Sequence, residues 1–198
     1  MAVILFGGSF DPIHKGHLAM MQEAHRFLPQ ADILLIPAAC SPFKTQNKMA
    51  SEEHRLKMCC LAVEDAPFVR VTDMEFFMEK PSYTVHTVEK LQAEHKDAYY
   101  FLCGADSFLS LQRWKNYEKL IGMVTFLVTN RGEVETEILQ KQIHWVERLG
   151  GKAYGLPMEK HPASSTLVRQ TVREGKNLGE LVSPSVERYI QETGLYKE

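Results

Sequence analysis

A segment near the N-terminus gathers residue types that bind phosphate. Residues Gly7 to His17 read GGSFDPIHKGH and directly follow the apolar run of residues 2–6. If that run is a buried strand, the segment is the turn into a helix, where free N–H groups and the positive end of the helix dipole attract anions. The glycines let the backbone approach a ligand closely, and His14 and His17 can face the same side of the first helical turn. The spacing therefore predicts an anion-binding site.

Simpler interpretations of this segment compete with an anion site. The segment lacks the GxGxxG of a dinucleotide fingerprint and the GxxxxGK[ST] of a P-loop. His14 and His17 could ligate zinc, but no third ligand lies nearby in the sequence, and HxxH is not the HExxH of zinc proteases. They could also be ordinary polar residues at a helix start. Two histidines that bracket a glycine at a predicted anion site favour a binding role.

Size and charge narrow the class of protein. The chain has 198 residues, 44% of them hydrophobic and 24% charged, which is typical of a folded globular protein and excludes disordered, collagenous and disulfide-scaffold classes. This length predicts one domain over residues 1–198. The net charge of −2 gives no basic excess, so a nucleic-acid partner is not expected.

The start of the chain and the cysteines bear on its compartment. The chain opens on an apolar run without a basic leader, and no run approaches about 18 apolar residues, so neither secretion nor membrane insertion is expected. Cys40, Cys59, Cys60 and Cys103 form no CxxC pair and no zinc spacing. We interpret them as free thiols in a reducing cytoplasm.

The rest of the chain alternates between strand and helix patterns. Strands are expected at residues 2–6, 32–37, 68–71, 98–103, 124–129 and 153–156, and helices at 20–28, 51–62, 84–94 and 139–149. The alternation predicts a doubly wound α/β fold with a mostly parallel sheet. Two further helices, 164–174 and 183–193, have no strand between them, so residues 164–198 are expected to form a small C-terminal helical extension. The longest predicted loop, 38–50, is a candidate for ligand binding.

Two motifs far apart in the chain resemble one superfamily. His14-Lys15-Gly16-His17 is a variant of the HxGH signature of the nucleotidylyltransferases, and residues 163–169, ASSTLVR, resemble their ISSTxxR signature. Between them, the PSYT of residues 81–84, the FLCGADS of residues 101–107 and Trp114 resemble the bacterial nicotinate-nucleotide adenylyltransferase family. The resemblance covers nearly the whole chain and implies a Rossmann-like nucleotidylyltransferase fold.

This resemblance implies a reaction and a role for each matched residue. The reaction would be AMP transfer from ATP to nicotinate mononucleotide, giving nicotinate adenine dinucleotide and pyrophosphate, with Mg²⁺ bound to ATP and no metal held by the protein itself. The implied catalytic residues are His14, His17 and Arg169; the ATP-binding residues are Gly7, Gly8, Ser9, Phe10, Gly104, Asp106, Ser165 and Thr166; the mononucleotide-binding residues are Lys44, Thr84, Trp114 and Arg131.

Several of these residues also have a structural interpretation. Asp106 and the serines before Thr166 could cap helices, Trp114 could be a core side chain, and Lys44 could be a solvated surface lysine. One position departs from the family pattern, because Phe43 replaces a histidine that the family usually carries before this lysine. An expected contact to the mononucleotide phosphate is therefore in question.

Other functions stay open on the sequence alone. The alternatives are a sister transferase such as phosphopantetheine adenylyltransferase or a cytidylyltransferase, an enzyme that prefers nicotinamide mononucleotide, and a catalytically silent sensor of NAD or ATP. An aminoacyl-tRNA synthetase, which uses a similar HIGH-type site, is set aside because this chain is short and shows no anticodon-binding region. The sequence makes no prediction of oligomeric state.

Overall fold

The computed structural model describes residues 1–40, 49–130, 132, 134–159 and 161–197. The strands are β1 (Ala2–Gly8), β2 (Asp32–Pro37), β3 (Val69–Val71), β4 (Ala98–Gly104), β5 (Thr125–Asn130) and β6 (Lys152–Pro157). The helices are α1 (Lys15–Phe27), α2 (Glu52–Ala62), α3 (Thr84–Glu94), α4 (Ala105–Leu109), α5 (Tyr117–Met123), α6 (Thr136–Arg148), α7 (Ser165–Arg173) and α8 (Pro184–Thr193), with two short 3₁₀ helices at Met74–Phe77 and Leu111–Arg113.

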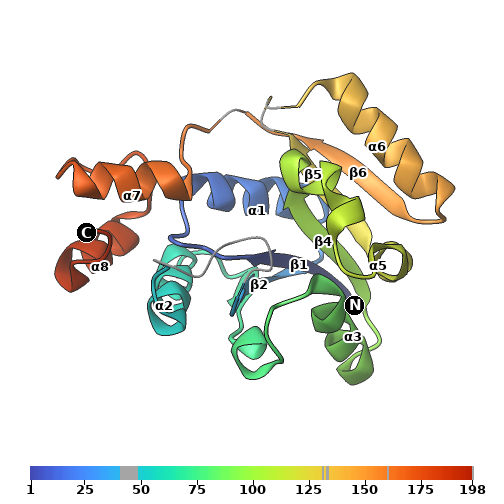
Figure 1. The fold of residues 1–198 in the computed structure, drawn as a ribbon, viewed down its shortest axis with the longest axis horizontal. Helices are drawn as coiled ribbons and strands as arrows, with labels where there is room; N and C mark the ends of the chain where they lie inside the picture. Colours follow the sequence, from blue (N-terminus) through green and yellow to red (C-terminus); the bar gives the residue numbers. More distant parts are fainter. Residues whose placement is uncertain (41–48, 131, 133, 160, 198) are drawn as a thin grey trace.

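The six strands form one parallel sheet in the order β3-β2-β1-β4-β5-β6 (Figure 1). The order reverses direction at β1, which pairs with β2 on one side and with β4 on the other. In open α/β sheets, ligands bind beyond the carboxyl ends of the strands at such a switch point. The predicted doubly wound α/β fold is confirmed, and the sheet brings Gly8 at the end of β1 near Gly104 at the end of β4.

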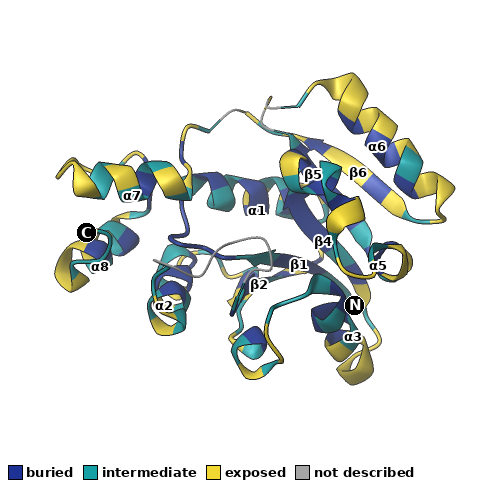
Figure 2. Ribbon diagram, in the orientation of Figure 1, coloured by how far each residue is buried: buried dark blue, intermediate teal, exposed yellow. Residues whose placement is uncertain are grey.

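Alternate residues of the central strands face opposite layers of helices. Ile4 and Phe6 of β1 join one core cluster with apolar residues of α1, α2, α7 and α8, whereas Leu5 joins a second cluster with residues of α3 to α6. Because both faces are covered, the strands read as continuous apolar runs rather than as alternating ones. Figure 2 shows the buried positions gathered on the central strands and on the helix surfaces turned toward them.

Local signals placed most element ends correctly. Ser51 caps α2 by accepting from the His54 N–H, and Ser183 caps α8 in front of Pro184. The first strand runs two residues further than predicted, because Gly7 and Gly8 stay extended and pair with β2. Between β4 and β5 the sequence indicated no helix, although α4 and α5 lie there. Helices of five and seven residues are too short to show a helical period.

The C-terminal helices pack onto the sheet domain. Val168 of α7 and Val186 and Ile190 of α8 are buried in the same cluster as Ile4 and Phe6 of β1. Figure 1 shows α7 and α8 at one end of the molecule, beside α1 and α2. The assignment of residues 1–198 to one domain, with 164–198 as its extension, stays a prediction. No helix within the described ranges is long and apolar enough to cross a membrane.

A tight backbone approach after α6 generates a stability prediction. A Cβ added at Gly151 would lie 2.4 Å from Cγ2 of Ile121 and 2.8 Å from Cγ1 of Val146, both buried. We expect Gly151→Ala to lower the free energy of unfolding by about 1–3 kcal/mol, because the core must shift to admit the methyl group. Chemical denaturation measures this change.

Gly122, inside α5, is the matched control. A Cβ there would meet nothing within 4 Å, so Gly122→Ala should be neutral or stabilise the fold by up to about 1 kcal/mol through helix propensity. Equal effects of the two substitutions would contradict the steric explanation.

Candidate active site

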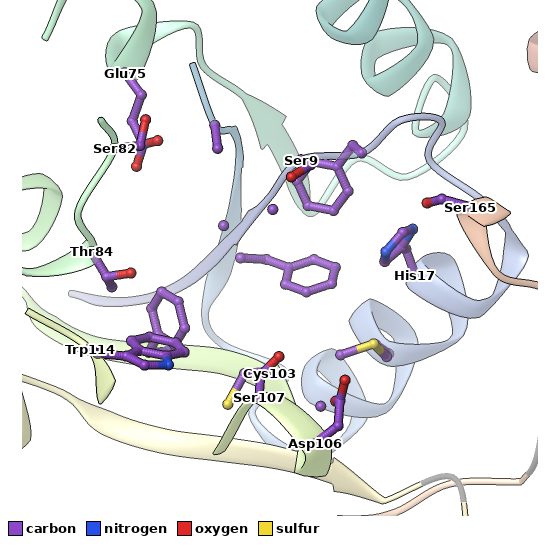
Figure 3. A pocket seen from close by; sticks show the side chains of 18 of the residues that line it. Ser9, His17, Glu75, Ser82, Thr84, Cys103, Asp106, Ser107, Trp114 and Ser165 are labelled. Carbon is purple, nitrogen blue, oxygen red and sulfur yellow. The ribbon is translucent and has the colours of Figure 1, made fainter. Parts of the chain in front are cut away.

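A cavity of about 740 Å³ opens at the carboxyl ends of β1 and β4. That volume lies within the range of small-molecule sites, about 300–1,000 Å³. Its walls come from the end of β1, the start of α1, the end of β4 with α4, the start of α3 and the start of α7. Figure 3 shows His17 and Ser165 at one end of this cavity, Thr84 and Trp114 at the other, and Asp106 on the wall near the His17 end.

Most of the predicted site residues line this one cavity. They are Gly7, Gly8, Ser9, Phe10, His14, His17, Thr84, Gly104, Asp106, Trp114 and Ser165. Thr166 and Arg169 lie on α7, and Arg169 reaches the loop between β1 and α1. Lys44 and Arg131 lie outside the described residues, as does Phe43. Segments more than 150 residues apart therefore meet at one site.

The two histidines at the start of α1 lie against each other. Their ring centroids are 3.7 Å apart, and His14 is buried while His17 is half-buried at the cavity wall. The main-chain N–H of His14 donates to Nδ1 of His17 at 3.3 Å. An accepting Nδ1 assigns the ring proton to Nε2. In this tautomer, His17 can donate a hydrogen bond to a phosphate oxygen.

The N–H groups at this helix start are partly used by the protein. The N–H of Lys15 donates to the Leu181 carbonyl at 2.8 Å, and that of His17 to the His14 carbonyl at 2.8 Å. Free N–H groups were expected at this helix start, and the N–H groups of Lys15 and His17 are not free. What this helix start offers an anion is therefore chiefly the histidine side chains and the helix dipole.

Glycines allow the close contacts around these histidines. A Cβ on Gly8 would lie 2.9 Å from the ring of Phe10, which stands edge-on to His17 with centroids 5.0 Å apart. A Cβ on Gly16 would lie 3.0 Å from Nδ1 of His14 and 3.2 Å from the Ala163 carbonyl oxygen. The glycine of the HKGH segment thus admits both the His14 ring and the chain that leads into α7.

Side chains of α7 bind the loop between β1 and α1. The Ser165 hydroxyl donates to the Pro12 carbonyl at 2.9 Å, and Nη1 of Arg169 donates to the Asp11 carbonyl at 2.6 Å. Ser164 caps the helix by accepting from the Leu167 N–H. The capping interpretation of this motif is therefore correct for Ser164. Ser165 and Arg169 fasten the loop, and Ser165 also lines the cavity.

Arg55 of α2 is a buried residue that the sequence analysis missed. It is 1% exposed, and its guanidinium donates to the carbonyl oxygens of Ser9 at 2.9 Å, Ala38 at 2.6 Å and Ala50 at 3.1 Å. Burial lowers the pKa of Arg55, and the nearby carboxylate of Asp11 opposes that shift. Arg55 therefore joins the end of β1 to the end of β2. The signal in the sequence that could have identified it is its position one helical turn before Met58 and Cys59, on the same face of α2.

The opposite end of the cavity is built on the start of α3. Thr84 is the first residue of this helix, and Trp114 stands edge-on to Phe101 of β4 with ring centroids 5.5 Å apart. Trp114 is half-buried and packs against the core cluster that contains Phe101, so the core interpretation is correct in part. Its indole faces the same space as Thr84 (Figure 3).

Glu75 and Ser82 fix the chain at this end of the cavity, and neither was predicted to be a site residue. The Thr87 hydroxyl donates to Oε1 of the buried Glu75 at 2.6 Å, and Ser82 Oγ accepts from the Ala39 N–H at 3.1 Å. Burial raises the pKa of the Glu75 carboxyl, and hydrogen bonds from Thr87 and Ser82 oppose the shift. These bonds fix the chain that leads into α3.

Lys115 places a cation at the same end. Its Nζ lies 4.3 Å from the centroid of the Tyr83 ring, a cation–π distance, and both residues line the cavity. Tyr83 directly precedes Thr84, so this charge stands near the α3 start. The cations expected from the sequence to bind the mononucleotide were Lys44 and Arg131, and Lys115 was not among them.

Asp106 stands on the cavity wall and does not cap its helix. Gly104 is the N-cap of α4, whereas Asp106 is the second residue of that helix and is exposed. A Cβ on Gly104 would lie 2.6 Å from Oδ1 of Asp106, so a larger residue at position 104 would displace this carboxylate. The capping interpretation of Asp106 is wrong, and its carboxylate is available to hydroxyl donors.

Thiol chemistry or metal-ion chemistry would need a reactive cysteine or a cluster of metal ligands. Burial raises the pKa of the Cys103 thiol, so Cys103 is protonated at neutral pH and is a poor nucleophile. Across residues 1–40, 49–130, 132, 134–159 and 161–197, no group of three His, Cys, Asp or Glu side chains could hold a metal ion.

Comparisons with known proteins place this geometry in a family. Residues 5–171 match the cytidylyltransferase-like family model. The chain is 38% identical over 197 residues to a probable nicotinate-nucleotide adenylyltransferase of Bacillus pumilus (strain SAFR-032), covering 98% of this chain and 97% of that one. It is 34% identical over 195 residues to a protein of the same name from Carboxydothermus hydrogenoformans, covering 98% and 96%.

Solved structures share the fold. One is the nicotinic acid mononucleotide adenylyltransferase of Plasmodium falciparum complexed with NaAD, with a TM-score of 0.81, 21% identity and coverage of 98% of this chain and 97% of that chain. Another is a putative nicotinate-nucleotide adenylyltransferase from Vibrio parahaemolyticus, with a TM-score of 0.71, 20% identity and coverage of 100% and 96%. At these identities the likeness supports the Rossmann-like arrangement of the sheet and helices.

Proposed function

The chain belongs to the nicotinate-nucleotide adenylyltransferases of the cytidylyltransferase-like family, and we propose that it transfers AMP from ATP to nicotinate mononucleotide, giving nicotinate adenine dinucleotide and pyrophosphate. One observation carries this proposal: a single cavity has a phosphate-type end at His17 and Ser165 and an aromatic, cationic end at Trp114 and Lys115. Two substrates can therefore meet between the ends.

ATP would lie along the β1 and α7 side of the cavity. His14 and His17 would contact its phosphates, with Nε2 of His17 as a donor. The β and γ phosphates would be held by Ser165, Thr166 and Arg169, and residues 7–10 would line the path of the triphosphate.

The adenosine of ATP would lie against Gly104. The exposed Asp106 carboxylate suits the ribose hydroxyl groups.

Nicotinate mononucleotide would lie at the α3 end of the cavity. The half-buried face of Trp114 suits the pyridine ring, and Thr84 at the α3 start suits the nicotinate carboxylate. Lys44 and Arg131 remain proposed contacts to this substrate. These assignments leave a phosphate oxygen of the mononucleotide facing the α-phosphorus of ATP.

The reaction requires positioning and charge stabilisation more than a strong base. A phosphate oxygen of nicotinate mononucleotide attacks the α-phosphorus of ATP, the bond from that phosphorus to the bridging oxygen breaks, and pyrophosphate leaves with the bonding electrons. The attacking phosphate is already ionised, so no side chain must remove a proton. His14, His17 and Arg169 would stabilise the negative charge that spreads over the phosphate oxygens.

Mg²⁺ would enter with ATP as part of the substrate complex. The described carboxylates that line the cavity, Glu75 and Asp106, stand apart, and Glu75 is engaged by Thr87, so the donor set suits an ion carried by phosphate oxygens and water. Bound in this way, Mg²⁺ neutralises charge on the triphosphate. A cytoplasmic location is also proposed, and the free thiols of Cys59, Cys60 and Cys103 support it.

Pyrophosphate release with different acceptors tests the proposal. We expect strong release from ATP and Mg²⁺ with nicotinate mononucleotide, weaker release with nicotinamide mononucleotide, and only background release with phosphopantetheine or with no acceptor. Strong release with phosphopantetheine would assign a sister activity. If ATP binds but no acceptor gives pyrophosphate release, the protein would be a nucleotide sensor.

His17→Ala tests the role of the phosphate-type end. Loss of the Nε2 donor should lower kcat by about a hundredfold or more while the Kd for ATP changes only a few fold, because the bond strengthens as charge develops on the phosphate. Steady-state kinetics and calorimetric ATP titration measure the two effects. His144→Ala, on the exposed surface of α6, is the control. Equal losses in kcat and in ATP affinity would refute a transition-state role for His17.

Lys115→Gln tests the charge at the mononucleotide end. Removing this cation should lower kcat/KM for nicotinate mononucleotide by about threefold or more and leave kcat/KM unchanged for nicotinamide mononucleotide, which has a neutral amide in place of the carboxylate. Lys119→Gln is the control, because Lys119 pairs with Glu89 at 2.5 Å on the outer surface. An unchanged acid-to-amide ratio in Lys115→Gln would remove Lys115 from substrate selection.

A further inference from the structure

The end of the chain reaches back to the loop between β1 and α1. The Tyr196 hydroxyl donates to Oδ1 of Asp11 at 2.8 Å, across 185 positions of sequence. Tyr196 lies just beyond α8 and has a φ of +67°. Residues other than glycine rarely adopt this backbone conformation. A strained residue persists only where its surroundings hold it. The contact is thus maintained at a conformational cost.

Asp11 is the point at which several segments meet. Its side chain is 5% exposed, and its Oδ1 also accepts from the Ala50 N–H at 3.1 Å. Its carbonyl oxygen accepts from Nη1 of Arg169 at 2.6 Å, whereas the same Nη1 lies 3.9 Å from Oδ2. Arg169 therefore bonds the main chain of Asp11 while the carboxylate is engaged by Tyr196 and Ala50.

We infer that Tyr196 is a positioning residue for the adenylyl transfer, and that its hydroxyl holds the Asp11 carboxylate so that Arg169 keeps its bond to the Asp11 carbonyl, in the loop that leads to the phosphate-type end of the cavity. The inference rests on the proposed function, in which Arg169 contacts the ATP phosphates. Without the hydroxyl, the buried carboxylate would lack one donor. The nearest cation able to replace that donor is Arg169, whose guanidinium would turn from the Asp11 carbonyl toward the carboxylate.

The groups around Tyr196 keep its phenol protonated, so its hydroxyl can donate a hydrogen bond. Burial raises the pKa of Tyr196, and the carboxylate of Asp11 raises it further, while Arg169 and Arg55 oppose the shift. The phenol is therefore protonated throughout the neutral range. Other bonds hold the loop independently, among them Ser165 to the Pro12 carbonyl and Lys15 Nζ to the Gly179 carbonyl at 2.5 Å. Loss of one hydroxyl should therefore leave the fold intact.

Tyr196→Phe, which removes only the hydroxyl, tests the inference. We expect kcat to fall about tenfold or more, as for loss of a hydrogen bond to a charged group, while KM for the mononucleotide stays within about twofold. Tyr189→Phe is the matched control, since that hydroxyl also belongs to the C-terminal helices but bonds to Nδ1 of His54 at 2.9 Å. Its kcat should stay within about twofold of the unsubstituted enzyme. Thermal unfolding of both variants separates stability from activity.

A double-mutant cycle with Asp11→Asn shows whether the hydroxyl acts through Asp11. If it does, adding Tyr196→Phe to Asp11→Asn should lower kcat by less than about threefold more, because coupled residues do not contribute independently. If Asp11→Asn does not fold, Arg169→Lys takes its place in the cycle. Full additivity, an unchanged kcat in Tyr196→Phe, or equal losses in Tyr196→Phe and Tyr189→Phe would each overturn the inference.

The cycle is distinguishable from a test of the proposed function. Every kcat is compared with that of the unsubstituted enzyme, using whichever acceptor gives strong pyrophosphate release. A different preferred acceptor would correct the proposed substrate and leave the Tyr196 comparison intact. An unsubstituted enzyme inactive with every acceptor would overturn both.

Discussion

The loop between β1 and α1 depends on donors for its carbonyl oxygens. Main-chain polar groups removed from water must be paired, and a turn that leaves a sheet has no neighbouring strand to pair them. Here the carbonyl of Ser9 accepts from Arg55, that of Asp11 from Arg169 and that of Pro12 from Ser165. Donors from α2 and α7 thus fix the loop, and with it the histidines at the start of α1.

This requirement gives the C-terminal helices their place in the structure. The sheet and α1 to α6 already enclose apolar layers on both faces, and α2 supplies Arg55 to the loop. The segment after β6 adds Ser165, Arg169 and Tyr196 at the same loop. Buried charges are costly unless they are paired, and Asp11 gathers the hydrogen bonds that make its burial acceptable.

The sequence predicted what depends on local pattern. The strands, the capped starts of α2 and α8 and the parallel sheet followed from apolar runs and helix periodicity, and the two motifs indicated segments that meet at one cavity. Short helices without a full period, α4 and α5, were missed. So were Arg55, Glu75 and Lys115, because their partners are distant in sequence and an isolated polar residue carries no pattern that identifies its partner.

The two ends of the cavity are joined through the segment that follows β2. Arg55 donates to the carbonyl oxygens of Ala38 and Ser9, and so links this segment to the β1 loop at the phosphate-type end. The N–H of Ala39 donates to Ser82, which also bonds to Glu75 beside the α3 start. A movement of the cavity end that is built on the start of α3 would therefore be transmitted to Ala39. From there it would reach Arg55 through the adjoining Ala38 carbonyl. In the proposed reaction, the positions of the two substrates relative to each other, on which an in-line transfer depends, would rest in part on this chain of hydrogen bonds.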